Sequence, residues 1–475
     1  MGRMNLTETK SVSYERAEVN KGYTDVSLRI NLTTTDILIN PIAASVKEKF
    51  IGGKGYDLWM MWNAVSGETR WDSPENAICI SSGPLGGTPG YPGGGKSIVT
   101  AISPLTGIPI DSNVGGYFGP YKKFAGFDVI QIDGKATEDT VILIDGIENK
   151  IKVFSAADLP KDSYEMSAAL THYFDETKPV NVSVVTAGPG AEKTNFGCLN
   201  FSWWDAGRKR VRYKQAGRGG IGTVFADKRV KAVVARFGSV SMKTNNPADL
   251  DALKLVTKAH AKGIATLDPK QNRMAVVGTT HLVPIMNDHD CLPVHNFKFG
   301  SHPESRVIGE DVYEHIFDKG FDGCWKGCTV ACSHGVKDFS PFTGPYKGTR
   351  VFVDGPEYET VATFGTMCLN SSIESVAKAN EICNKMGMDT ISCGSTIAFA
   401  IECFENGLIT LEDTEGLDLS WGNSQAIINM TEKIGKKEGF GAILSRGSQA
   451  AADHIGKNAH DFLTTVKGQI GRAHV

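Results

Sequence analysis

The sequence predicts an α+β protein in which a β-rich first half is followed by a helical second half. Apolar residues alternate with polar ones from Val26 to Leu32, which is the period of a strand with one buried face. Short apolar runs separated by glycine follow this stretch. Beyond Asn246, apolar residues recur every three or four positions, as they do in helices. We therefore expect a β-rich domain over residues 21–240 and helical domains over residues 241–469.

Composition is typical of a globular protein. The 475 residues are 41% hydrophobic and 22% charged, with a formal net charge of −3, so we expect no nucleic-acid partner. No apolar run approaches the ~20 residues of a membrane span, and residues 1–20 read as a polar, disordered tail without a secretory signal. The ten cysteines have no disulfide-framework spacing, so we expect a reducing, cytoplasmic location.

Glycine is abundant, with 53 residues, and much of it interrupts the strands of the first half. The main clusters are Ser82–Thr88, Tyr91–Lys96 and Asn113–Gly119, and a later cluster surrounds Arg218. These glycines either form hairpin turns or bring backbone N–H groups to the phosphate oxygens of a ligand. Arg218 is correspondingly either solvated or part of an anion site. We expect no nucleotide fold, because these glycine clusters separate short predicted strands and do not form a predicted βαβ unit.

Two helices are predicted on either side of a short joint over residues 384–389. Residues 371–374 form a capping box for the first helix, and Gly387 should end that helix. Asp389 precedes the second helix, which runs to about Asn406. The joint gathers a helix C-terminus, a carboxylate and the free amides of a new helix, which suits a polar heterocycle. A plain helix–turn–helix joint is the alternative.

Three cysteines lie close together in the stretch Gly323–Gly335. Cys324, Cys328 and Cys332 have three residues between each pair, whereas the other cysteines are scattered. Such spacing fits a thiolate-held iron–sulfur centre. A structural zinc site with His334 as fourth ligand is a second interpretation, and three buried thiols without a metal are a third.

In their order along the chain, the motifs resemble the tungsten-containing aldehyde:ferredoxin oxidoreductase family over about residues 28–468. The stretches that carry the resemblance are Gly52-Gly-Lys-Gly55, Gly83-Pro-Leu85, Ser103-Pro-Leu-Thr-Gly107, Asn113-Val-Gly-Gly-Tyr-Phe-Gly119, Ala125-Gly-Phe-Asp128, Gly188-Pro189, Arg218-Gly-Gly-Ile-Gly222, Leu292-Pro-Val-His-Asn-Phe297, the cysteine cluster, Gly355-Pro-Glu-Tyr-Glu-Thr360 and Gly387-Met-Asp-Thr-Ile-Ser392. The resemblance implies a β-rich floor for a tungsten (or molybdenum) bis-pterin cofactor, helical domains that cover it, and a [4Fe–4S] cluster held by the cysteines.

The resemblance also implies roles for single residues. It assigns two groups to the pterin cofactor, those at its phosphates, which are Asn113, Arg218 and Gly219, and those of a pterin-binding motif, which are Asn384, Gly387 and Asp389. An Mg²⁺ ion bridging the phosphates is a further expectation. The family motif often begins with Asp, where this chain has Asn384.

Catalysis has four candidate residues. Glu357 matches a glutamate with an acid–base role near the metal, and a plain helix cap is the alternative. Cys291 is either a soft thiolate ligand for tungsten or a small buried residue. His289 is a candidate proton donor, as is His295, unless both simply lie at the surface.

The predicted reaction is oxidation of an aldehyde to a carboxylic acid, with ferredoxin as electron acceptor. One alternative is reductive dearomatisation of an aromatic acyl-CoA with an electron-transfer subunit, and another is a zinc-stapled binding protein without redox chemistry. The pattern allows a homodimer and does not choose the substrate.

Two departures from the family pattern affect this interpretation. Cys324 and Cys328 have three residues between them, where the family usually has two. Together with the stretch Thr343–Gly348, this resembles the branch that contains the tungsten subunit of benzoyl-CoA reductase. The fourth cluster cysteine, the second pterin motif and a catalytic histidine of full-length relatives lie beyond Val475. We therefore expect a C-terminally truncated chain in which residues 470–475 are a non-native tail.

Overall fold

Two β-sheets carry the first half of the chain, as the alternating and glycine-interrupted stretches predict. The computed structural model describes residues 4–310, 312, 314, 322–333, 343–344, 347–350 and 354–471. Within these residues, the strands of a seven-stranded sheet are, in spatial order, β1 (Asn5–Ser13), β9 (Lys150–Ala157), β8 (Thr140–Asp145), β13 (Val230–Arg236), β10 (Val182–Ala187), β11 (Leu199–Asp205) and β12 (Arg210–Ala216). Those of a six-stranded sheet are β3 (Asp36–Pro41), β2 (Val26–Asn31), β7 (Val129–Asp133), β4 (Ile78–Ser81), β5 (Ser97–Ile102) and β6 (Pro109–Val114).

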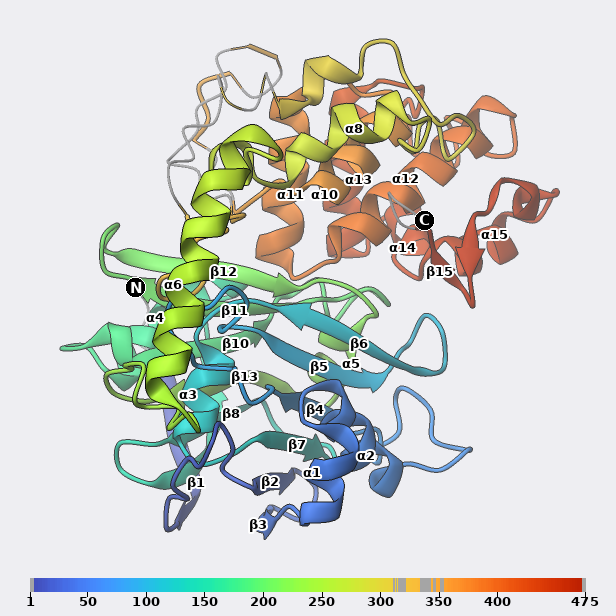
Figure 1. The fold of residues 1–475 in the computed structure, drawn as a ribbon. Coiled ribbons are helices and arrows are strands. Elements are labelled where there is room, and N and C mark those ends of the chain that lie inside the picture. Colours follow the sequence, from blue (N-terminus) through green and yellow to red (C-terminus); the bar gives the residue numbers. More distant parts are fainter. Residues whose placement is uncertain are drawn as a thin grey trace. The chain divides into compact units, whose positions relative to one another are not determined.

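Both sheets are mixed. Strands β8 and β13 run parallel, as do β2 and β7, and the other neighbours pair antiparallel. The helices associated with the sheets are α1 (Ala44–Phe50), α2 (Lys54–Ala64), α3 (Phe118–Phe124), α4 (Ser163–Phe174), α5 (Ile221–Asp227) and α6 (Leu250–Leu267). Helix α5 contacts strands of both sheets, whereas α4 packs on β10, β11 and β12 and α2 packs on β4 and β5 (Figure 1). The loop that precedes α5 and carries Arg218 is therefore anchored by both sheets.

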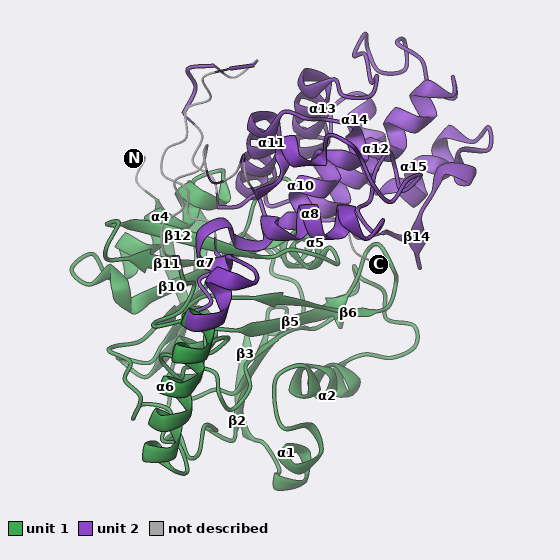
Figure 2. Ribbon diagram, turned by 45° about the horizontal axis from the view of Figure 1, so that its top comes forward, with its two compact units in different colours: residues 1–192, 198–265, 323–329 green, residues 193–197, 266–322, 330–475 purple. Residues whose placement is uncertain are grey.

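The chain divides into two compact units, which Figure 2 colours separately. Unit 1 comprises residues 1–192, 198–265 and 323–329, and unit 2 comprises residues 193–197, 266–322 and 330–475. Apart from residues 266–267 of α6, the described α-helices and strands of unit 2 are α7 (Met274–Val277), α8 (Leu282–Asp288), α10 (Tyr358–Phe364), α11 (Ile373–Met386), α12 (Thr390–Glu405), α13 (Ser424–Lys436), α14 (Phe440–Leu444), α15 (Ser448–Ile455), β14 (Thr465–Val466) and β15 (Gln469–Ile470). Helix α12 is buried along most of its length against α10, α11 and α13. An α+β fold with β-rich and helical parts is thereby confirmed.

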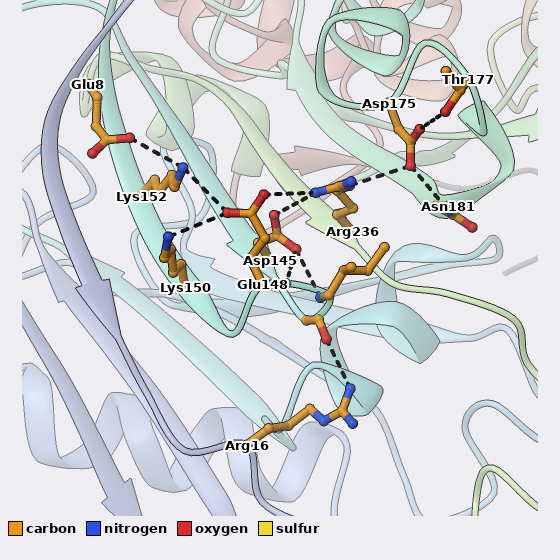
Figure 3. A network of polar contacts seen from close by, with 12 residues as sticks. Glu8, Arg16, Asp145, Glu148, Lys150, Lys152, Asp175, Thr177, Asn181 and Arg236 are labelled. Atoms are coloured by element: carbon orange, nitrogen blue, oxygen red, sulfur yellow. Dashed lines mark hydrogen bonds and ion pairs between the residues drawn. The ribbon is translucent and has the colours of Figure 1, made fainter.

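The prediction of a disordered tail over residues 1–20 is wrong for the residues that form β1. This strand pairs antiparallel with β9 and forms an edge of the seven-stranded sheet. The Glu8 carboxylate lies 3.4 Å from the Lys152 ammonium, and Arg16 donates to the carbonyl of Gly146 over 2.9 Å. Figure 3 shows both contacts beside the ion pairs of Arg236. An edge strand pairs with one neighbour and needs no fully buried face. The sequence of β1 can therefore be polar throughout, without the apolar–polar alternation that would have predicted a strand.

Several local boundaries also differ from prediction. The alternating stretch that begins at Val26 forms only the first strand, β2, of a hairpin that continues with β3. Helix α6 begins after Asp249, whose carboxylate accepts from two following N–H groups, rather than at Asn246. The cap of α11 is Ser372, because its hydroxyl, and not that of Ser371, accepts from the N–H of Ser375 over 3.2 Å.

Two further predictions concern the surface and the chain end. None of the described helices is long and apolar enough to cross a membrane. In the predicted non-native tail, Ile470 pairs with Thr465 and is buried, while residues 472–475 lie outside the described part of the chain.

Candidate cofactor and catalytic sites

The cysteine segment, defined as residues 323–329, belongs to unit 1 and forms a tight turn. The backbone N–H of Cys328 donates to the carbonyl of Trp325 over 3.1 Å. A Cβ atom on Gly323 would lie 3.5 Å from the Cβ of Cys328, so the chain folds closely back on itself. Cys328 is buried and Cys324 is half-buried. The turn gives two of the three predicted metal ligands a common local frame.

Glycines of unit 1 allow the cysteine segment to approach the β-rich body closely. A Cβ atom on Gly115 would lie 2.6 Å from the Sγ of Cys324, a distance at which the two atoms would collide. The N–H of Gly90 donates to the carbonyl of Lys326 over 2.8 Å. Sequence alone leaves turns and phosphate binding as the roles of these glycines. The structure adds a third role, because some of them make room for a segment that is distant in sequence.

Trp325 anchors the segment. Its side chain is 3% exposed, and its Nε1 donates to the carbonyl of Thr88 over 2.9 Å. The ring of Tyr117 lies 4.6 Å from the Trp325 ring, centroid to centroid, and 6.1 Å from that of Trp203. Burial raises the pKa of Tyr117 to about 12, and the nearby Cys324 thiol adds to that shift. Tyr117 therefore stays protonated beside Cys324 at neutral pH.

Cys332 lies in unit 2, where it forms an isolated parallel bridge with Asp322. Among the described residues, no group of three or more His, Cys, Asp or Glu side chains is gathered closely enough to hold a metal ion. His334, the expected fourth zinc ligand, is outside the described residues. A shared metal site for Cys324, Cys328 and Cys332 thus stays a prediction. The donor set fits it chemically, because cysteine thiolates are soft ligands that bind iron–sulfur clusters and zinc.

Two of the three residues predicted at the pterin phosphates, Arg218 and Gly219, lie against β6, the strand that carries the third, Asn113. Asn113 is exposed on β6, one residue from Ser112, whose hydroxyl accepts from the backbone N–H of Arg218 over 3.2 Å. Gly219 has a φ of +88°, and a Cβ atom there would lie 2.6 Å from the Cγ2 of Ile110. Glycine is needed for both the conformation and the contact. The loop with Arg218 and Gly219 therefore packs on the face of β6 that carries Ile110 and Ser112, whereas Asn113 alternates with these residues along the strand.

The second predicted pterin group lies at the joint between α11 and α12 in unit 2. Gly387 ends α11 with a φ of 74°, as expected. Asp389 caps α12, because its Oδ1 accepts from the N–H of Ile391 over 2.9 Å and its Oδ2 accepts from a serine hydroxyl in the next turn. The side-chain amide of Asn384 donates to the carbonyl of Asp354 over 3.0 Å. The helix–turn–helix joint is real, and these polar groups already stabilise it.

Glu357 lies immediately before α10, yet its side chain makes no capping hydrogen bond. Its Oε2 instead accepts from the hydroxyl of Thr279 over 2.6 Å. The same hydroxyl accepts from the backbone N–H of Tyr358 over 2.9 Å. Thr279 therefore orients the carboxylate while it satisfies a helix N-terminus. Sequence reasoning missed Thr279, since nothing local links it to Glu357.

The remaining catalytic candidates lie differently from expectation. Cys291 is exposed, so its interpretation as a small buried residue is wrong, and its Sγ donates to the carbonyl of His289 over 3.2 Å. His289 is also exposed. Burial raises the pKa of Tyr358, and the charges of Glu359 and Cys291 add to that shift, which relates Cys291 to the start of α10.

His295, in contrast to Cys291 and His289, is not an exposed surface residue. Its ring lies 4.0 Å from that of Trp421, centroid to centroid, in an edge-on arrangement. Its Nε2 is 3.8 Å from the carboxylate of Glu405, and its side chain is 14% exposed. This packing gives His295 a role in stabilising unit 2.

Known proteins resemble the chain along most of its length. A family model for the N-terminal domain of aldehyde ferredoxin oxidoreductase matches residues 27–237, and a model for domains 2 and 3 matches residues 254–475. The tungsten-containing aldehyde ferredoxin oxidoreductase of Pyrococcus furiosus is 31% identical over 445 residues, which cover 90% of this chain and 67% of the relative. The Pyrococcus abyssi protein of the same name is 30% identical over 460 residues, covering 94% and 70%.

Two more distant relatives carry other names. The WOR-like subunit of an aliphatic sulfonate oxidoreductase from Pyrococcus furiosus is 26% identical over 473 residues, covering 95% of this chain and 71% of the relative. Among solved structures, the active-site complex BamBC of benzoyl coenzyme A reductase with 1,5-dienoyl-CoA matches with a TM-score of 0.75. It is 22% identical and covers 96% of this chain and 66% of the matched one, so it shows a common fold. The chain spans about two thirds of the length of these relatives.

Proposed function

The chain belongs to the aldehyde ferredoxin oxidoreductase family, and on that premise we propose that it oxidises an aldehyde to a carboxylic acid. We propose ferredoxin as the electron acceptor and, because the ten cysteines have no disulfide-framework spacing, the reducing cytoplasm as its location. One observation carries the proposal. The Sγ of Cys324 occupies the space beside Gly115, directly after the strand that carries Asn113. A candidate cluster ligand, Cys324, therefore lies beside the end of the strand that carries a candidate pterin-phosphate ligand, Asn113.

The side chains fit the cofactors that the family implies. Cys324, Cys328 and Cys332 would hold an iron–sulfur cluster, since thiolates are its usual ligands. Asn113, Arg218 and Gly219 offer amide, guanidinium and backbone groups of the kinds that would suit phosphate oxygens and an Mg²⁺ ion. When bound, a tungsten bis-pterin supplies the two-electron chemistry at the aldehyde carbon, and the cluster carries electrons away one at a time.

The residues of the pterin-binding motif have a second duty. Asn384, Gly387 and Asp389 stabilise the joint through hydrogen bonds that the structure contains already. Ligand contacts there would come from the atoms that these bonds leave available, above all backbone groups at the start of α12. Their part in the proposal is to hold the joint in one shape.

Glu357 is our candidate for the proton transfer that accompanies oxidation. A carboxylate accepts the proton that a hydrated aldehyde or water releases, and the Thr279 hydroxyl holds it in one orientation. Cys291 and His289 are exposed, and we assign them at most a supporting role in proton exchange with solvent. The chain's own contribution is thus orientation and proton transfer.

A second candidate function is reductive dearomatisation of an aromatic acyl-CoA with an electron-transfer subunit. The three residues between Cys324 and Cys328 favour it, together with the fold shared with the BamBC complex. Product analysis separates the two reactions. Aldehyde oxidation yields a carboxylic acid and reduces a one-electron acceptor, whereas the alternative yields a dienoyl thioester and consumes reductant.

Metal analysis with absorption and electron paramagnetic resonance spectra tests the proposal. Protein purified without oxygen from cells grown with tungstate should contain tungsten and about four irons. Cys324→Ser and Cys328→Ser should each lose most of the iron, whereas Cys403→Ser, a substitution of a buried cysteine in α12, should retain it. Zinc alone in the purified protein would contradict the proposal and favour a zinc-stapled binding protein.

A further inference from the structure

A buried lysine occupies an oxygen cage in unit 1. Lys123, in α3, is fully buried, and its Nζ lies 2.8 Å from each of three carbonyl oxygens. Those oxygens, a fourth carbonyl at 3.1 Å and a side-chain amide oxygen at 3.3 Å belong to Gly22, Gly83, Gly86, Pro84 and Asn245. Five acceptors surround one nitrogen with three N–H bonds, which suits a protonated amine.

The cage determines the shape of a loop rich in glycine. Residues 82–88 contain three glycines and a proline, so this loop has few side chains of its own with which to hold a conformation. Three of its carbonyls point at Lys123. Burial lowers the pKa of Lys123 to about 7, and the negative charge of Asp128 opposes that shift. Burying a charge destabilises a protein unless the contacts of that charge compensate. We therefore expect the contacts of the Lys123 ammonium to matter.

The same loop receives the cysteine segment. Asn245 accepts from Lys123, and its amide donates to the carbonyl of Pro84 over 2.7 Å and to the hydroxyl of Thr88 over 3.2 Å. The carbonyl of Thr88 then accepts from Nε1 of Trp325. A continuous set of hydrogen bonds thus runs from the Lys123 ammonium through residues 82–88 to the cysteine segment.

We propose that Lys123 is a positioning residue for the cysteine segment. Its ammonium holds residues 82–88 in the shape that accepts Trp325, and Trp325 in turn sets the places of Cys324 and Cys328. The placement of the thiols does not depend on the proposed function. The effect of this placement on an iron–sulfur cluster does rest on the proposed function.

Unit 1 also offers a matched control. Lys228 is fully buried too, and its Nζ donates to the carbonyls of Pro74 and Gly134 over 3.1 and 3.0 Å. Burial lowers the pKa of Lys228 to about 8. Neither acceptor belongs to residues 82–88 or to the cysteine segment. Loss of this ammonium should destabilise unit 1 without releasing the two thiols.

Alkylation of the metal-free protein, read by peptide mass spectrometry, tests the proposal. We expect Lys123→Met to raise the labelling rates of Cys324 and Cys328 at least about tenfold relative to exposed Cys291, because the segment opens locally. Trp325→Phe, which removes the last hydrogen bond, should act in the same direction. Lys228→Met should leave these relative rates unchanged even where it lowers the melting temperature.

Two outcomes would overturn the proposal. One is a Lys123→Met protein that is less stable than wild type but labels Cys324 and Cys328 at the wild-type relative rate. The other arises if Lys123→Met does not fold and Asn245→Ala, which removes the amide between Pro84 and Thr88, leaves labelling unchanged. Iron content of the purified variants is a second readout. Because alkylation needs no metal, a protein without a cluster would contradict the proposed function and leave this inference standing.

Discussion

Unit 1 holds its cysteine segment through hydrogen bonds such as that between Trp325 and Thr88, 237 positions apart, whereas unit 2 holds its pterin-motif residues at the ends of two consecutive helices. In unit 1 the acceptors are loop carbonyls gathered by a buried lysine. In unit 2 the contacts of Gly387 and Asp389 are mostly with residues a few positions away. A segment that must be held against a distant part of the chain needs long-range contacts, while a binding turn can be built from two helix caps.

The largest expected effect concerns Glu357, which departs from this contrast because its partner Thr279 is 78 positions away. Glu357→Gln keeps the shape of the side chain but removes the base. We expect the rate of aldehyde oxidation to fall about 10²–10⁴-fold, the usual contribution of a general base. Steady-state kinetics with a viologen acceptor measures the change, on protein whose metal content matches the wild type.

Two variants separate catalysis from folding at this position. Glu359→Gln changes the neighbouring glutamate in the first turn of α10 and should leave the rate within about twofold, as expected away from the site. Thr279→Val removes the hydroxyl that orients Glu357, and Thr279→Ser restores it. An equal loss in the Glu357 and Glu359 variants would show that the helix end, rather than the base, matters.

The next prediction tests the long-range packing of unit 1. Gly115→Ala places a Cβ atom 2.6 Å from the Cys324 Sγ, so the thiol or the strand end must move. We expect most of the bound iron to be lost. Gly238→Ala is the control, because a Cβ atom there meets nothing within 4 Å and the position has no positive φ. Full iron content in Gly115→Ala would mean that the cysteine segment is free to shift.

A smaller effect should come from the interior charges of unit 1. Asp57 is fully buried in α2, and burial raises its pKa to about 8. The folded state therefore binds a proton between about pH 4 and 8 that the unfolded state releases, so the free energy of unfolding should fall as pH rises through this window. The slope is up to ~1.4 kcal/mol per pH unit for one group.

Urea unfolding between pH 5 and pH 6 measures this slope. Asp57→Asn cannot titrate and should flatten it, while Asp36→Asn, a substitution of an exposed residue on β3, should reproduce the wild-type slope. Parallel curves for the wild type and Asp57→Asn would contradict the assigned proton. Loss of charge on the buried lysines acts in the opposite direction, and the lowered pKa is about 7 for Lys123 and about 8 for Lys122 and Lys228, so the slope is read between pH 5 and pH 6.

The contrast also explains what could be predicted from sequence. The end of α11 at Gly387 and the start of α12 at Asp389 follow from the residues themselves. The contact between Thr279 and Glu357 depends on tertiary structure, because neither residue carries a local sign of the other. The sequence does carry one local signal of the buried lysines of unit 1. Lys122 and Lys123 stand inside the mostly apolar run of residues 118–127, where two lysines call for internal partners.

The smallest effect separates two adjacent serines at the start of α11. The capping-box pattern favours Ser371, but the hydroxyl of Ser372 is the one that accepts from the N–H of Ser375. Ser372→Ala should therefore lower the free energy of unfolding by about 1 kcal/mol, whereas Ser371→Ala should change it by only a few tenths. Urea unfolding of both variants decides between them. If only Ser372→Ala lowers the stability and Asn384 keeps its place at the other end of α11, each helix cap acts locally. Unit 2 then tolerates the loss of one cap. Equal losses would instead mean that the two serines share the cap.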